Sequence, residues 1–176
     1  QSDDSVCGPT ANITFNNFSS GYNAAFNWQF GNGQTSTKRN PKAVTYQQND
    51  YRDTTYYITL QGSNQCGLSQ EQDSIVVSPT PKATFAMDKD QGCSPLPVGF
   101  ANQAIGVPDS LYWHFGDGAS QRTGPIEDTL KHVFSTGEAD TQYVITQTAK
   151  NQCGTDQTKD TVKVFPNTVT AFFSVD

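Results

Sequence analysis

The chain has 176 residues with a formal net charge of −6, and only 16% of them are charged, against about 25% in an average protein. Such a surface could not neutralise a row of phosphates, which excludes nucleic acid as a partner. No apolar run reaches the length of about 18 residues that spans a bilayer. Gln1 begins without a Met, a basic region or an apolar run, so we expect a piece of something larger.

Short strands are predicted along the whole chain. Apolar and polar residues alternate around 13–15, 26–30 and 56–60, and again around 98–100, 111–115 and 143–145. β-branched runs at 74–77 and 161–165 end each half. Clusters of Gly, Asn, Asp and Pro separate the runs, and no amphipathic helical stretch of useful length appears. The pattern predicts an all-β antiparallel sandwich.

The two halves of the chain repeat each other. NQCG at 64–67 recurs at 151–154, and Cys-x-Pro at 7–9 recurs at 93–95. Prolines near 80 and 166 are typical of short, stiff joints. We therefore predict one module over residues 1–80 and a second over 81–166.

The last ten residues look like the start of another repeat. AFFSVD at 171–176 resembles ATFAMD at 83–88, so residues 167–176 are predicted to be the opening strand of a third module. The same alignment places the first module's opening strand before Gln1. Two explanations stay open: a piece of a longer array, or a spare strand that completes the first module of another chain by strand addition.

The four cysteines form no close pair of the kind that binds zinc. Each module holds one early and one late cysteine, which predicts Cys7–Cys66 and Cys93–Cys153 disulfides; four free thiols are the alternative. Each bond would close a loop of about 60 residues, stabilise its module by about 4 kcal/mol, and indicate an oxidising, extracellular setting.

A six-residue motif marks each module, as WQFGNG at 28–33 and WHFGDG at 113–118. We expect its aromatic residues in the core, its glycines at a turn, and Asn32 or Asp117 bonded to the turn backbone. His114 should face solvent, and nothing places a nucleophile beside a histidine. We therefore expect no enzyme. The signature residues are Trp28, Phe30, Gly31, Asn32 and Gly33, with Trp113, Phe115, Gly116, Asp117 and Gly118.

This motif resembles the WDFGDG-like segment of the PKD domain, an immunoglobulin-like β-sandwich of extracellular proteins. The family's later pattern is similar to His132-Val133-Phe134, Gly137 and Tyr143-Val144-Ile145; the first module has Val44 and Tyr46 at the first two positions and no matching Gly. With its cysteines, the chain resembles tandem PKD modules of Bacteroidota surface proteins, such as adhesins and gliding-motility proteins exported by the type IX system.

That resemblance implies a structural role. The chain would be a disulfide-stapled spacer or adhesive region of a large, secreted or outer membrane-attached protein, with neighbouring modules as partners and surface glycans or other cell-surface proteins as further candidates. The alternative is a carbohydrate-binding or accessory module of a secreted polysaccharide- or protein-degrading enzyme. Exposed aromatics would be needed for that role, and the candidates are scattered: Tyr22, Tyr51, Tyr57 and Tyr112.

The resemblance also implies O-glycosylation, because Bacteroidota modify Asp followed by Ser or Thr and then a small apolar residue or Thr. A strand entrance is the alternative explanation for this pattern. The candidate hydroxyls belong to Ser5, Thr54, Ser74, Ser110, Thr129 and Thr161.

One acidic turn is a weak calcium candidate. Asp88 and Asp90 stand two apart and are followed by a Gly, but the other ligands of an EF-hand loop are absent. A solvated acidic turn is the alternative, and no other cofactor is expected.

Overall fold

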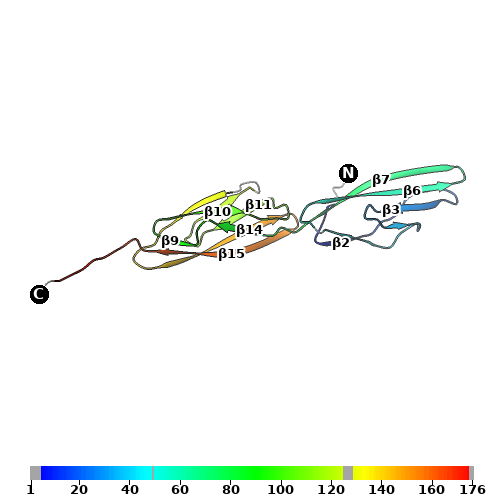
Figure 1. Cartoon of the computed structure of the whole chain (residues 1–176). Coiled ribbons are helices and arrows are strands. Elements are labelled where there is room, and N and C mark those ends of the chain that lie inside the picture. The colour runs from blue at the N-terminus through cyan, green and yellow to red at the C-terminus, as the bar shows by residue number, and fades with distance from the viewer. Residues whose placement is uncertain (1–4, 49, 125–128, 175–176) are drawn as a thin grey trace. The chain divides into compact units, whose positions relative to one another are not determined.

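The computed structural model describes residues 5–48, 50–124 and 129–174, in which every regular element is a β-strand. The chain divides into two compact units, Gln1–Thr80 and Pro81–Asp176. Each unit is built from two sheets (Figure 1). No helix long and apolar enough to cross a membrane occurs among the described residues.

The first unit has a five-stranded and a two-stranded sheet. The larger sheet has the order β1-β7-β6-β3-β4, and β2 pairs with β5 in the smaller one. The strands are β1 (Ser5–Cys7), β2 (Thr10–Ile13), β3 (Ala25–Gln29), β4 (Thr35–Ser36), β5 (Val44–Gln47), β6 (Thr54–Asn64) and β7 (Gly67–Ser78).

The second unit repeats this plan with one strand more. Its larger sheet has the order β12-β11-β14-β15-β9, which matches the first unit strand for strand, and its smaller sheet is β13-β10-β8. The strands are β8 (Phe85–Met87), β9 (Gln91–Cys93), β10 (Leu96–Asn102), β11 (Ser110–His114), β12 (Ser120–Thr123), β13 (Thr129–Phe134), β14 (Thr141–Asn151) and β15 (Gly154–Phe165).

The NQCG motif forms the tight turn of a long hairpin in each unit, β6–β7 and β14–β15 (Figure 1). The Asn side chain accepts a hydrogen bond from the Cys backbone N–H, at 2.9 Å in Asn64–Cys66 and 2.8 Å in Asn151–Cys153. The strands run well beyond the apolar residues that predicted them, because the hairpin ladder continues to pair polar residues up to the turn.

The core of each unit lies between its two sheets. Side chains alternate along β3 and along the second half of β11, so that Trp28 and Trp113 are buried while Gln29 and His114 are exposed. The buried clusters are Ala11, Trp28, Phe30, Val44, Tyr46, Ile58, Ile75 and Val77 in the first unit, and Ala83, Leu96, Val98, Phe100, Leu111, Trp113, Phe115, Phe134, Ile145, Ala149, Val162 and Val164 in the second.

The predicted disulfides within each module are wrong. Cys7 and Cys153 are disulfide-bonded, whereas Cys66 and Cys93 are free, exposed thiols. The reason is the length of the last strand. Cys93 lies beside Phe165, at one end of β15, and Cys153 lies in the turn at its other end.

That strand has 12 residues, so its ends are roughly 35 Å apart at ~3.3 Å per residue. A disulfide requires Cα atoms within about 7 Å. In the first unit, Cys7 lies beside Ser78 and Cys66 lies at the opposite end of the equally long β7. Neither unit can therefore close a disulfide between its own two cysteines.

Candidate functional site

The signature motif forms a glycine turn at the end of β3 and of β11. Gly31 has φ 74° and Gly116 has φ 82°, in the left-handed region that glycine adopts without strain. A Cβ on Gly31 would lie 2.6 Å from the Tyr57 carbonyl oxygen, and one on Gly116 would lie 2.7 Å from that of Val144. The first glycine of each motif is thus required both by its backbone angle and by the neighbouring strand.

Asp117 joins this turn to the opposite sheet. One carboxylate oxygen accepts the backbone N–H of Ala119 at 2.9 Å, as the sequence predicted. The other lies 2.7 Å from Nε2 of His132 on β13. The His132 ring stacks on Phe115, with ring centroids 4.0 Å apart. The pair therefore clamps the turn after β11 onto β13.

The pKa of Asp117 reflects opposing effects. Desolvation by burial acts to raise it, but hydrogen bonds from His132 and Ala119, together with the charge of His132, outweigh that effect and hold the pKa below its ordinary value. The ionised carboxylate is thus the form that the folded second unit favours.

In the first unit, Asn32 and Tyr46 make the contacts that hold the corresponding turn. Asn32 Oδ1 accepts the backbone N–H of Gln34, as predicted, and its Nδ2 donates to the Thr45 carbonyl, both at 3.0 Å. The Tyr46 hydroxyl donates to the Phe30 carbonyl at 3.0 Å. Burial, together with the nearby Tyr56, raises the pKa of Tyr46 to about 12. These signature turns, although largely exposed, therefore hold the two sheets of each unit together.

A tyrosine in each unit makes a bond that the sequence analysis missed. The Tyr56 hydroxyl donates to the Gln47 carbonyl at 2.8 Å, and the Tyr143 hydroxyl donates to the Ser135 carbonyl at 2.6 Å. Both bonds run back to the preceding strand or its end, like the tyrosine corner of immunoglobulin-like sandwiches. The recurrence of Tyr at both positions of the repeat was the signal that could have revealed it.

The candidate glycosylation residues do not share one environment. Ser5, Thr54 and Thr129 begin strands, as expected, but Ser74 and Thr161 lie inside β7 and β15. Ser110 also begins a strand, but it is only 4% exposed. A glycan on Ser110 would have to displace the residues that cover its hydroxyl in the folded second unit. Asp4 and Asp128, which precede two of the other candidates, lie outside the described residues.

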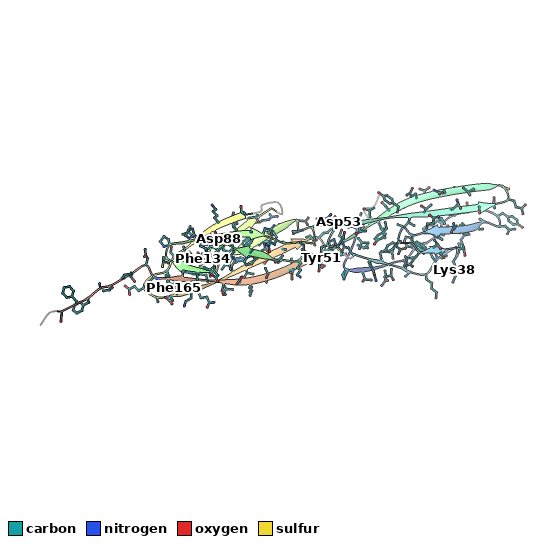
Figure 2. The ribbon with its side chains drawn as sticks, viewed as in Figure 1. Lys38, Tyr51, Asp53, Asp88, Phe134 and Phe165 are labelled. Carbon is teal, nitrogen blue, oxygen red and sulfur yellow. The ribbon has the colours of Figure 1, made fainter. Side chains whose placement is uncertain are left out.

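At the acidic turn, the Asp88 side chain and the Asp90 backbone carbonyl both accept hydrogen bonds from backbone N–H groups. Asp88, labelled in Figure 2, accepts the Gly99 backbone N–H at 2.8 Å. The Asp90 carbonyl accepts the backbone N–H of Lys163 at 2.8 Å. In the described residues, no group of three or more His, Cys, Asp or Glu side chains could hold a metal ion. Calcium prefers six or more oxygen ligands, of which these two side chains could supply only a part.

The tyrosines considered for sugar binding do not form a shared platform. Tyr22 and Tyr51 lie in separate loops and Tyr57 lies on β6, all three exposed. Tyr112 is half-buried and stacks with the Arg122 guanidinium, 5.4 Å from its ring centroid. A cavity of about 630 Å³ lies instead in the first unit over β3, β6 and β7.

This architecture places the chain in the class of immunoglobulin-like β-sandwiches. The titin I-band fragment I67–I69 matches with a TM-score of 0.61 at 13% identity, over 91% of this chain and 62% of that one. The amphioxus IgVJ-C2 molecule gives 0.54 at 12%, over 91% and 99%. The mouse nectin-like molecule 4 ectodomain gives 0.46 at 16%, over 85% and 57%. This chain thus spans less than two thirds of the titin and nectin-like structures.

A family model specifies the first unit further. Residues 2–77 match the PKD domain, so the first unit is a PKD/immunoglobulin-like module. None of the curated proteins matches the chain. At these low identities the solved structures establish the fold alone. The PKD match agrees with the family that the WQFGNG motif predicted.

Proposed function

We propose that this chain is a non-enzymatic spacer or adhesive repeat region of a larger extracellular protein. Its partners would be further modules of the same kind. The observation that carries the proposal is the repeat itself: two units share one strand order, one signature turn and one placement of cysteines. PKD and immunoglobulin-like domains commonly serve as structural or adhesive modules, and a disulfide favours an oxidising compartment.

The states of the cysteines fit an extracellular setting. Cys7 and Cys153 are disulfide-bonded, whereas Cys66 and Cys93 are free thiols. Disulfides form and persist in oxidising compartments, so we propose that the chain is exported.

Peptide mapping tests this arrangement. Digestion of the non-reduced chain should yield one cross-linked species that contains Cys7 and Cys153. Alkylation before reduction should label Cys66 and Cys93 and leave the other two unmodified. A cross-linked peptide that joins Cys7 to Cys66 would contradict the proposal, as would alkylation of all four cysteines without reduction.

We further propose that the parent protein is a glycosylated Bacteroidota surface protein of the type IX secretion class. The cysteine pattern and the recurrent Asp-Ser/Thr sites support this origin. Intact mass of material from the native source should exceed the polypeptide mass by whole glycans, located on Thr54 or Ser74 rather than on the buried Ser110. A native mass equal to that of the polypeptide would remove glycosylation from the proposal.

A further inference from the structure

The larger sheet of the second unit has one side on the core and the other in solvent. Figure 1 labels β9, β11, β14 and β15 of this sheet. Because side chains alternate along a strand, every second residue points away from the core. Among the described strand residues, these outward positions hold no carboxylate but several exposed cations. We call this surface the basic face, and its cations are Arg122, Lys150, Lys159 and Lys163.

The acidic residues of the same strands lie on the opposite side of the sheet. Asp156 and Asp160 on β15 pair with Ala149 and Ile145 of β14, which are both buried. Cross-strand partners share one side of a sheet, so both carboxylates belong to the inward side. The Ala83 N–H donates to Asp156 there, at 2.8 Å. Positive and negative side chains are therefore sorted between the two sides of this sheet.

The first unit builds the same face without charge. At the register where the second unit has His114 and Lys159, the first has Gln29 and Gln72. None of the described outward positions in its five-stranded sheet is charged. The fold thus does not require cations on this surface. The other neutral counterparts are Ser63 for Lys150 and Val76 for Lys163.

Three of the four cations have no acidic partner among the described residues. Lys163 is the exception, since it lies 3.2 Å from Asp140 and above the Phe165 ring. The Arg122 guanidinium lies over the half-buried Tyr112 ring, 5.4 Å from its centroid, a contact that leaves its charge in place. Arg122, Lys150 and Lys159 therefore present uncompensated positive charge in a chain whose net charge is −6.

Hydroxyl and amide groups fill the space between these three cations. Thr146, Thr148 and Gln157 lie on the same face, and Gln157 Nε2 donates to Thr148 Oγ1 at 2.9 Å. Neighbouring strands lie ~4.8 Å apart and successive outward residues ~6.6 Å apart, so the register places the backbone positions of the three cations roughly 12–16 Å from one another. The face therefore offers separated charges with neutral hydrogen-bonding groups between them.

This spacing selects among anionic polymers. DNA carries a charge about every 3.4 Å along each strand, which is far denser than the cations of the basic face. A polysaccharide that contains uronic acids presents carboxylates that are separated by neutral, hydroxyl-rich sugar rings. Its charges and its hydroxyls both find a counterpart on this surface, because side-chain amides and hydroxyls donate and accept hydrogen bonds.

We propose that the basic face binds an acidic polysaccharide of the uronate class. Arg122, Lys150 and Lys159 pair with sugar carboxylates, while the threonine and glutamine side chains between them bond sugar hydroxyls. A single exposed ion pair contributes little, so the affinity depends on the three cations acting on one polymer chain. The inference deepens the adhesive role proposed above, and it rests on the extracellular setting in which such polymers occur.

Calorimetric titration of the full chain with oligogalacturonates and oligoalginates tests the proposal. The parent chain should bind at low salt, and binding should weaken as salt is added, because exposed charges are screened. The triple variant Arg122→Gln, Lys150→Gln and Lys159→Gln should bind about tenfold more weakly, as expected for the loss of three exposed ion pairs. Trp113 fluorescence during denaturation should show that this variant folds like the parent chain.

The matched control changes three cations of the second unit that lie outside the basic face. The triple variant Lys82→Gln, Lys89→Gln and Lys131→Gln alters the net charge by the same amount at exposed positions. It should bind nearly as tightly as the parent chain, because the polymer does not contact these side chains. Equal losses in the two triple variants would reduce the effect to overall charge and overturn the proposal.

Other outcomes would also overturn it. These are no binding of either uronate oligomer at low salt, equal binding of neutral dextran, and tighter binding of single-stranded DNA or of anionic lipid vesicles. Each of these results would leave the spacer role in place, because peptide mapping of the cysteines tests the extracellular setting separately.

Discussion

Gly116 lies where both the backbone angle and the neighbouring strand exclude a side chain. We expect Gly116→Ala to lower the free energy of unfolding of the second unit by about 2–4 kcal/mol, since the variant combines left-handed strain with a steric clash against Val144. Chemical denaturation followed by the fluorescence of Trp113, in a Trp28→Phe background, measures it. Gly118 is the control.

Gly118 has φ 95°, and a Cβ there would meet nothing within 4 Å. Gly118→Ala should therefore cost only the backbone strain, about 1–2 kcal/mol. Equal losses for the two variants would show that the contact with Val144 does not constrain the turn.

The Asp117–His132 pair should make the stability of the second unit depend on pH. Because folding lowers the pKa of Asp117, its contribution is present above the unfolded pKa and is lost as pH falls through the folded one. Asp117→Asn should cost about 1 kcal/mol or less near pH 6, since the pair remains in contact with water. The difference from the parent chain should shrink from about pH 4 downward.

Denaturation curves at pH 6 and pH 3 check this expectation. Asp140→Asn is the control, because Asp140 makes an exposed ion pair with Lys163 at 3.2 Å and should change stability by less than ~0.5 kcal/mol. A loss for Asp117→Asn that is equally large at both pH values would contradict a role for the ionised carboxylate.

At the scale of single elements, Tyr56 and Tyr143 fix the start of the long hairpins. Tyr143→Phe should destabilise the second unit by about 1 kcal/mol, the usual cost of one hydrogen bond, and Tyr56→Phe should do the same to the first. Each unit holds one tryptophan, so Trp28 and Trp113 fluorescence separate the two effects. A change in the unit that keeps its tyrosine would contradict a local role.

The sequence predicted the features that depend on neighbouring residues, and it missed those that depend on residues far apart in the chain. Alternating side chains placed β3 and β11 correctly, and Gly-Asn-Gly or Gly-Asp-Gly placed the turns, because both patterns act within a few residues. The disulfide pairing failed because sequence spacing does not tell which end of a 12-residue strand a cysteine occupies. The Asp117–His132 contact was missed because Asp117 lies in the turn after β11 and His132 lies on β13, 15 residues away.

At the scale of the whole chain, the two units should differ in stability. The first leaves Leu60 and Gly62 half-buried at the cavity of about 630 Å³, where the second buries Gln147 and Ala149. Less buried surface means a smaller gain on folding. We expect Trp28 to report unfolding at a lower denaturant concentration than Trp113. Coincident transitions, or the reverse order, would contradict this.

The hydrogen bond from Gln147 Nε2 to Asn102 Oδ1, 3.0 Å long, has a consequence for biosynthesis. Tandem copies that emerge from a ribosome one after another can exchange equivalent strands and become trapped in misassembled states. If β6 took the place of β14, Leu60 would replace Gln147, and an aliphatic contact would replace that hydrogen bond inside the sandwich. Divergence between adjacent copies at this register therefore disfavours strand exchange on the nascent chain.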